Sequence, residues 1–138
     1  MHKKFNSKPV TRHKAGEDYL EAILVLANSK GFVRSIDVAN LLEFSKPSVS
    51  RAVSVLKEAG YITVDENHYL FLTDSGRKIA EEIYERHRFF TDFLTKIGVD
   101  PIIAEEDACQ MEHVVSAESF EKLKEFWSSI ETESEFNI

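Results

Sequence analysis

The residues best suited to chemistry lie in the stretch Cys109–His113. In a helix, Cys109, Glu112 and His113 stand at positions i, i+3 and i+4, so their side chains leave the same face. A thiolate, a carboxylate and an imidazole that converge in this way can bind a transition metal ion. Two further carboxylates, Asp18 and Glu21, show the same i, i+3 spacing near the N-terminus. The spacing therefore predicts a metal site whose donors come from distant segments.

A third segment offers His87, which lies on the apolar stripe of an expected helix. Carboxylates suit Mn²⁺ and Fe²⁺, imidazole suits most first-row ions, and thiolate favours Fe²⁺, Co²⁺ or Zn²⁺ over Mn²⁺. Six donors from three helices can fill an octahedral or paired site. Plainer roles exist for each: Asp18 and Glu21 can favour a helix N-terminus, His87 can be a core histidine, and Cys109 a small buried hydrophobe.

The elements that must position these donors are mostly helical. Ser35 is a good N-cap for a short helix, and Ser45 is a good N-cap with Pro47 in the first turn behind it. Thr73 caps a longer helix further on. Two short strands separated by polar residues read as a hairpin, a wing beside a helix-turn-helix at 35–59. We expect a flexible basic arm at 1–13, a loose acidic tail from Glu131, strands at 61–64 and 69–72, and helices at 14–29, 36–42, 46–59, 74–97, 101–114 and 117–131.

The second helix of the helix-turn-helix begins with small and polar side chains. Hydroxyl groups and proline let a backbone approach a DNA groove closely, and an arginine one turn later can reach a phosphate or a guanine edge. The alternative is an ordinary capped helix in a bundle that binds no DNA. The predicted DNA contacts are Ser45, Lys46, Pro47, Ser48, Ser50 and Arg51.

Composition fits a soluble globular protein of one or two small domains. The net charge of −7 is divided unevenly: residues 1–57 hold 10 Lys+Arg against 5 Asp+Glu, and residues 58–138 hold 7 against 19. A basic first half and an acidic second half suit a DNA-reading part and a regulatory part. The single cysteine excludes an internal disulfide, and no apolar run approaches the length of a membrane span. We expect a cytoplasmic protein with no membrane partner.

Five runs along the chain together resemble the diphtheria-toxin-repressor and manganese-transport-regulator (DtxR/MntR) family of metal-dependent repressors. The run at 106–116, EDACQMEHVVS, is the most specific of them. The others are EDYLE at 17–21, SKPSVS at 45–50, LTDSGR at 72–77 and RHR at 86–88.

The resemblance implies a mainly α fold with a small β wing: a winged helix-turn-helix domain at 1–73 and a helical metal-binding and dimerisation domain at 74–138. It implies that Asp18, Glu21, His87, Cys109, Glu112 and His113 are the metal ligands. The sequence as it stands is similar to the short branch of the family, without the SH3-like domain of longer iron-responsive members.

The expected ligand positions combine features of the two branches of the family. Asp18 and Glu21 look like the manganese branch, whereas Cys109 looks like the iron branch. Thr91 falls where iron-type members carry an acidic ancillary ligand, and Glu105 can still join His87 in such a site. Both Mn²⁺ and Fe²⁺ therefore stay open, with Co²⁺, Ni²⁺ or Zn²⁺ expected to substitute in vitro.

The resulting hypothesis is a homodimeric transcriptional regulator. Metal bound between the two domains restricts the relative motion of the winged helices, so that a dimer reads a pseudo-palindromic operator in double-stranded DNA. We expect a repressor of metal-uptake genes and not an enzyme, because the chain offers no separate general base and no glycine-rich phosphate loop. The alternatives are a winged-helix sensor of a small organic ligand and a purely structural helical dimer.

Overall fold

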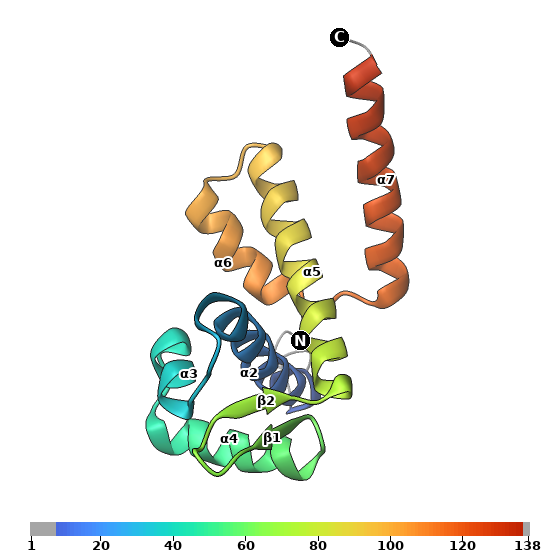
Figure 1. Ribbon diagram of the computed structural model, residues 1–138. Helices are drawn as coiled ribbons and strands as arrows, with labels where there is room; N and C mark the ends of the chain where they lie inside the picture. The colour runs from blue at the N-terminus through green and yellow to red at the C-terminus, as the bar shows by residue number, and fades with distance from the viewer. Residues whose placement is uncertain (1–7, 137–138) are drawn as a thin grey trace. The chain divides into compact units, whose positions relative to one another are not determined.

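The computed structural model describes the backbone of residues 8–136 and the side chains of residues 16–133 (Figure 1). The chain forms two compact units, the first ending at Tyr84 and the second beginning at Glu85. The predicted fold class, mainly α with a small β wing, is confirmed. Within the described part of the chain, none of the helices has the length and apolar character needed to cross a membrane.

The first unit is a winged helix-turn-helix. Helices α2 (Lys8–Lys30), α3 (Ser35–Leu42) and α4 (Lys46–Glu58) precede the antiparallel strands β1 (Ile62–Val64) and β2 (Leu70–Leu72). Val33 adds a single antiparallel bridge to Leu70, so the segment before α3 contributes one residue pair beside the hairpin. The core gathers apolar side chains from every element, among them Leu20, Ile23, Val38, Val49, Leu56, Ile62 and Leu70.

Short-range capping fixes the starts of α4 and α5 as predicted. The Ser45 hydroxyl accepts from the Ser48 N–H at 3.3 Å, with Pro47 in the first turn. Thr73 Oγ1 accepts from the Gly76 N–H at 3.2 Å and donates to the Gly60 carbonyl at 2.7 Å. The Thr73 hydroxyl thereby ties the start of α5 to the base of the wing.

Two predictions in the N-terminal region are wrong. The helix expected at 14–29 begins at Lys8, so residues 8–13 are helical and not an arm. Pro9 in the first turn is compatible with that start, because its fixed φ suits a helix and its missing N–H costs nothing there. Residues 1–7 lie outside the described chain. The N-cap of α3 is Arg34 and not Ser35, because the Asp37 carboxylate accepts from the Arg34 N–H at 2.8 Å.

The second unit is helical. It contains the end of α5 (Asp74–Lys96), then α6 (Pro101–Met111) and α7 (Ala117–Phe136). Its core is aromatic: Phe90 and Phe120 are buried, and the Phe93 ring meets the Trp127 ring at 4.8 Å. An ion pair of 2.6 Å between Lys96 and Glu131 also joins α5 to α7.

The ends of the last two helices differ from the prediction. Helix α6 stops at Met111, three residues earlier than expected, and residues 112–114 form a turn. Helix α7 continues to Phe136, so the tail expected to be loose from Glu131 is helical as far as the described chain extends. The i, i+3, i+4 pattern of Cys109, Glu112 and His113 thus runs across a helix end.

Candidate metal centre

The local sequence of α6 fixes where this helix starts and which of its faces is buried. Asp100 caps α6 by accepting from the N–H groups of Ile102 and Ile103, and Pro101 follows in the first turn. Ala104 and Ala108 are fully buried on one face. Ala108 packs in one cluster with Phe90 of α5, and Cys109 stands directly after this alanine.

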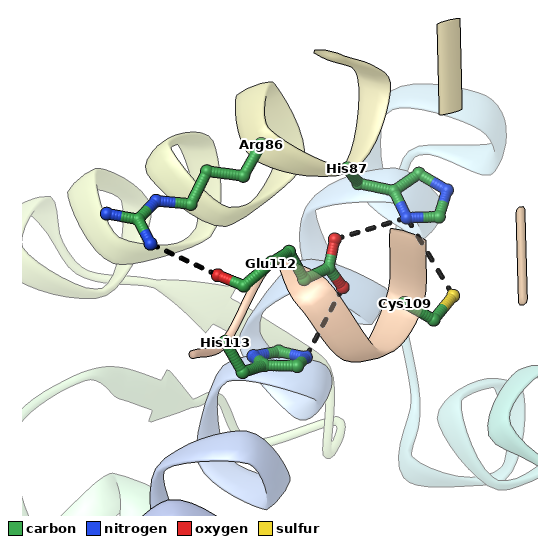
Figure 2. A network of polar contacts seen from close by, with 5 residues as sticks. All are labelled: Arg86, His87, Cys109, Glu112 and His113. Atoms are coloured by element: carbon green, nitrogen blue, oxygen red, sulfur yellow. Dashed lines mark hydrogen bonds and ion pairs between the residues drawn. The ribbon is translucent and has the colours of Figure 1, made fainter. Parts of the chain in front are cut away.

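Three donors from α5 and α6 converge within the second unit. His87 Nδ1 lies 3.1 Å from Glu112 Oε2 and 3.8 Å from Cys109 Sγ (Figure 2). One donor atom from each of the three residues lies within 4.8 Å of the other two. The structure therefore brings together a nitrogen, a sulfur and an oxygen donor from 87, 109 and 112.

His113 contacts the other oxygen of the same carboxylate. Its Nε2 lies 3.3 Å from Glu112 Oε1, which is buried and accepts no well-formed hydrogen bond from any described residue. Glu112 is 1% exposed and is the one fully buried charged residue among those described. A buried carboxylate with an unused lone pair is costly unless a cation compensates it.

Electrostatics in this cluster favour positive charge. The Cys109 sulfur and the Glu112 carboxylate raise the pKa of His87 to about 10 from its ordinary 6.5. Burial alone would raise the pKa of Glu112, but hydrogen bonds from His113 and His87 outweigh burial and hold it below its usual value. Without a metal ion, a proton on His87 thus supplies part of the positive charge that the carboxylate requires.

The donor set fits a divalent transition metal. Donors bound at about 2.0–2.3 Å from one ion lie at most about 4.5 Å apart, close to the spread of His87, Cys109 and Glu112. The orphaned Glu112 Oε1 offers a further lone pair beside His113. Nitrogen, sulfur and carboxylate oxygen together suit Fe²⁺, Co²⁺ or Zn²⁺, and the carboxylate and imidazole also suit Mn²⁺.

The other predicted ligands lie apart from this cluster or in the first unit. Glu105 stands one turn before Cys109 on α6, is exposed, and is not among the converging donors. Asp18 and Glu21 lie one turn apart on α2, at partly exposed positions.

Arg86 was not singled out in the sequence as a site residue, yet it holds the turn that carries Glu112. Its Nη1 donates to the Glu112 carbonyl at 3.2 Å (Figure 2). The same nitrogen also donates to the Val115 carbonyl. No local pattern marks this role, because both acceptors are backbone carbonyls and 26 or more residues away along the chain.

The predicted DNA contacts all lie at the start of α4 in the first unit. Ser45, Lys46, Pro47, Ser50 and Arg51 are exposed, whereas Val49 between them is fully buried. Ser48 is partly buried, and its hydroxyl accepts from Ser45 Oγ at 2.8 Å. A shallow hollow of about 300 Å³ borders this segment and is lined by Ser35, Ile36, Lys46, Val49 and Ser50.

Comparison with known proteins decides the family. The "Iron dependent repressor, N-terminal DNA binding domain" model matches residues 13–70, and the "Iron dependent repressor, metal binding and dimerisation domain" model matches residues 73–135. The chain belongs to the iron-dependent repressor family. Members of this family are metal-dependent, DNA-binding transcriptional regulators, which disfavours a sensor of a small organic ligand.

Relatives of this chain include transcriptional regulators named MntR. The chain is 36% identical over 124 residues to the transcriptional regulator MntR of Salmonella typhimurium, covering 90% of this chain and 79% of that one. It is 35% identical over 107 residues to the HTH-type transcriptional regulator MntR of Shouchella clausii, covering 78% of this chain and 75% of the relative.

Solved structures of iron-dependent repressors share the fold. The manganese regulator SloR superposes with a TM-score of 0.74 at 28% identity, over 82% of this chain and 53% of that one. The T. acidophilum IdeR superposes with a TM-score of 0.72 at 26% identity, over 81% of this chain and 53% of that one. The present chain thus spans about half the length of these solved chains.

Proposed function

We propose that this protein is a metal-activated repressor of metal-uptake genes. The observation that carries the proposal is the convergence of one donor atom each from His87, Cys109 and Glu112 within 4.8 Å of one another, around a carboxylate that is buried. Membership of the iron-dependent repressor family supports the regulatory role. In this role the region 1–73 reads DNA, and the region 74–138 binds metal and dimerises.

The ligand set we propose joins both regions. His87, Cys109, Glu112 and His113 hold the ion from the C-terminal side, and Asp18 and Glu21 complete its coordination from α2. Glu105 is an ancillary ligand that joins His87 in binding a second ion. A bound divalent ion supplies positive charge and a directional cross-link between these donors.

The physiological ion in this proposal is Mn²⁺ or Fe²⁺. SloR is a manganese regulator by name, which supports Mn²⁺. Cys109 supports Fe²⁺, because a thiolate binds the softer ions more tightly than it binds Mn²⁺. Co²⁺, Ni²⁺ and Zn²⁺ have compatible donor preferences and serve as substitutes in vitro.

The DNA partner we propose is a pseudo-palindromic duplex read by a cytoplasmic homodimer, with no membrane partner. Ser45, Lys46, Pro47, Ser48, Ser50 and Arg51 make the contacts. Hydroxyl groups and Lys46 anchor phosphates, and Arg51 reaches a phosphate or a base edge. Two copies place two such helices on half-sites separated by whole turns of the duplex.

A binding measurement with and without metal tests the proposal. Fluorescein-labelled DNA is first selected from a random duplex library by protein supplied with Mn²⁺ or, without oxygen, Fe²⁺. Fluorescence anisotropy is then recorded with each ion and with EDTA. We expect either ion to raise DNA affinity by about 10- to 100-fold, the usual range of coupling between two ligands.

The His113→Ala variant should lose most of this increase, because it removes one of the proposed ligands. Glu133→Ala, which removes an exposed carboxylate from the second unit, serves as the control and should behave as wild type. Equal DNA affinity of the wild-type protein in EDTA and in metal would contradict the proposal.

A further inference from the structure

We propose that Arg86 is a positioning residue for the metal centre, which fixes the backbone of Glu112 by bonding both ends of the 112–115 turn. The inference rests on the proposed function, since it concerns the same centre. It adds a residue that binds no metal itself but sets where one of the ligands stands.

The Glu112 N–H still bonds the Ala108 carbonyl at 3.0 Å, but the next two residues bond only three positions back along the chain. Helix α6 ends at Met111, and the last carbonyls of a helix lack partners within it. The His113 N–H reaches the Gln110 carbonyl only at 3.4 Å, and the Val114 N–H bonds the Met111 carbonyl at 3.2 Å. The segment therefore needs support from outside.

Arg86 supplies that support at both ends of the turn. One nitrogen, Nη1, donates to the Glu112 carbonyl at 3.2 Å and to the Val115 carbonyl. These two carbonyls flank the turn, so a single guanidinium fixes their separation. Because the Glu112 carbonyl belongs to the ligand residue itself, the bond also limits movement of its Cα and hence of its carboxylate.

Neighbouring positions on α5 hold Glu112 from two sides. Arg86 bonds the backbone of Glu112, and His87 bonds its carboxylate at 3.1 Å (Figure 2). Consecutive residues of a helix point about 100° apart, which lets the two side chains reach different parts of one residue. A buried ring supports the arrangement, since the Arg86 guanidinium carbon lies 5.2 Å from the centre of Phe120.

Charge alone does not explain an arginine at this place. A guanidinium beside the site repels a divalent cation, so its electrostatic effect lowers metal affinity. The two N–H groups of its terminal nitrogen Nη1, held in a rigid plane, suit two carbonyl acceptors. If this positioning matters more than the repulsion, Arg86 raises metal affinity. The two effects have opposite signs, and the sign of the change in affinity on removing Arg86 therefore separates them.

The test compares full-length wild type with Arg86→Met, Arg86→Lys and a matched control. Lys124→Met is the control, because Lys124 also lies over the Phe120 ring, at 4.6 Å, but its ammonium pairs with Glu85 and Glu121 and not with the turn. Affinities for Mn²⁺ and Co²⁺ are measured by calorimetry, the Co²⁺ absorption spectrum is recorded, and amide hydrogen exchange at 113–116 is followed in the metal-free proteins.

We expect Arg86→Met to weaken binding of both ions by about 10- to 100-fold, the usual effect of losing a group that orients a ligand. The Co²⁺ spectrum should change, and exchange at 113–116 should accelerate. Arg86→Lys, which keeps one donor group, should fall between Arg86→Met and wild type, and Lys124→Met should match wild type.

Unchanged or tighter binding by Arg86→Met, with a wild-type Co²⁺ spectrum, would overturn the inference. If Arg86→Met does not fold, wild-type affinity and exchange in Arg86→Lys and in Arg86→Gln would overturn it equally. A wild-type protein that binds neither ion would contradict the proposed function instead. The exchange measurement needs no metal, so it still decides whether Arg86 holds the turn.

Discussion

Glu112 combines a buried carboxylate with contacts to three different side chains. His87 and His113 approach its two oxygens, and Arg86 bonds its carbonyl. The histidine contacts keep the pKa of the carboxyl below its usual value although burial opposes this. At the residue scale, protons on the neighbouring imidazoles compensate the Glu112 carboxylate when no metal ion is bound.

Metal affinity should rise with pH because His87 must release a proton to become a ligand. Its pKa of about 10 means that the metal-free protein carries this proton throughout the range from pH 6.5 to 8.5. Displacing one proton strengthens binding by about tenfold per pH unit. Calorimetric titration with Mn²⁺ at three pH values in this range measures the slope.

The same proton makes the stability of the metal-free protein pH-dependent. A pKa raised from 6.5 to about 10 on folding gives a stabilising contribution that is complete below pH 6.5 and is lost as the pH rises towards 10. His87→Gln removes the titrating group and should flatten both trends. An identical slope of metal affinity in His87→Gln and wild type would contradict this assignment.

At the scale of elements, local chemistry predicted the starts of α4 and α5 and the hairpin between them, because Ser45, Thr73 and short polar turns act over a few residues. It failed where a neighbouring group competes for the same role. Asp37 accepts from Arg34 and so moves the cap of α3 back from Ser35. The spacing of Cys109 and Glu112 predicted that they lie near one another, whereas the approach of His87 and the contacts of Arg86 depend on how α5 and α6 pack.

Gly76→Ala should destabilise the first unit. A Cβ at this position would overlap the carbonyl oxygen of Tyr61, which also accepts the Thr73 N–H at 3.0 Å at the junction of the wing and α5. Overpacking of this kind costs about 1–3 kcal/mol or more. Urea unfolding followed by circular dichroism gives the change in the free energy of unfolding.

Gly16→Ala is the matched control for that measurement. Gly16 is also helical, in α2, and a Cβ there meets no atom within 4 Å. Alanine in place of glycine inside a helix is favourable by about 0.5–1 kcal/mol. If Gly76→Ala is as stable as Gly16→Ala, the backbone at Tyr61 can move away from the added Cβ without loss of stability, and the prediction is wrong.

At the scale of the whole molecule, charge and chemistry divide between two regions. Residues 1–57 carry a net charge of +5 and residues 58–138 a net charge of −12. The predicted DNA contacts lie in the first unit, whereas the donors His87, Cys109 and Glu112 lie in the second. In the proposed mechanism, Asp18 and Glu21 are the ligands of the first unit through which metal binding affects DNA binding.

Asp18→Ala should separate metal binding from DNA activation. The variant keeps the donors of the second unit, so calorimetry should still detect Mn²⁺ or Co²⁺ binding, about 10- to 100-fold weaker. Anisotropy should show that saturating metal no longer raises DNA affinity. Glu81→Ala, which removes an exposed carboxylate from the same unit, should retain both properties. Full activation of Asp18→Ala by metal would exclude Asp18 from the coupling.

The contact between Phe93 and Trp127 has a practical consequence. Trp127 is the only tryptophan in the chain, and its indole Nε1 is buried without a hydrogen-bond partner among the described residues. Its fluorescence therefore originates entirely in the unit that carries His87, Cys109 and Glu112. An emission change on adding Co²⁺ or a denaturant would report on that unit alone, with no label attached and no contribution from the winged helix.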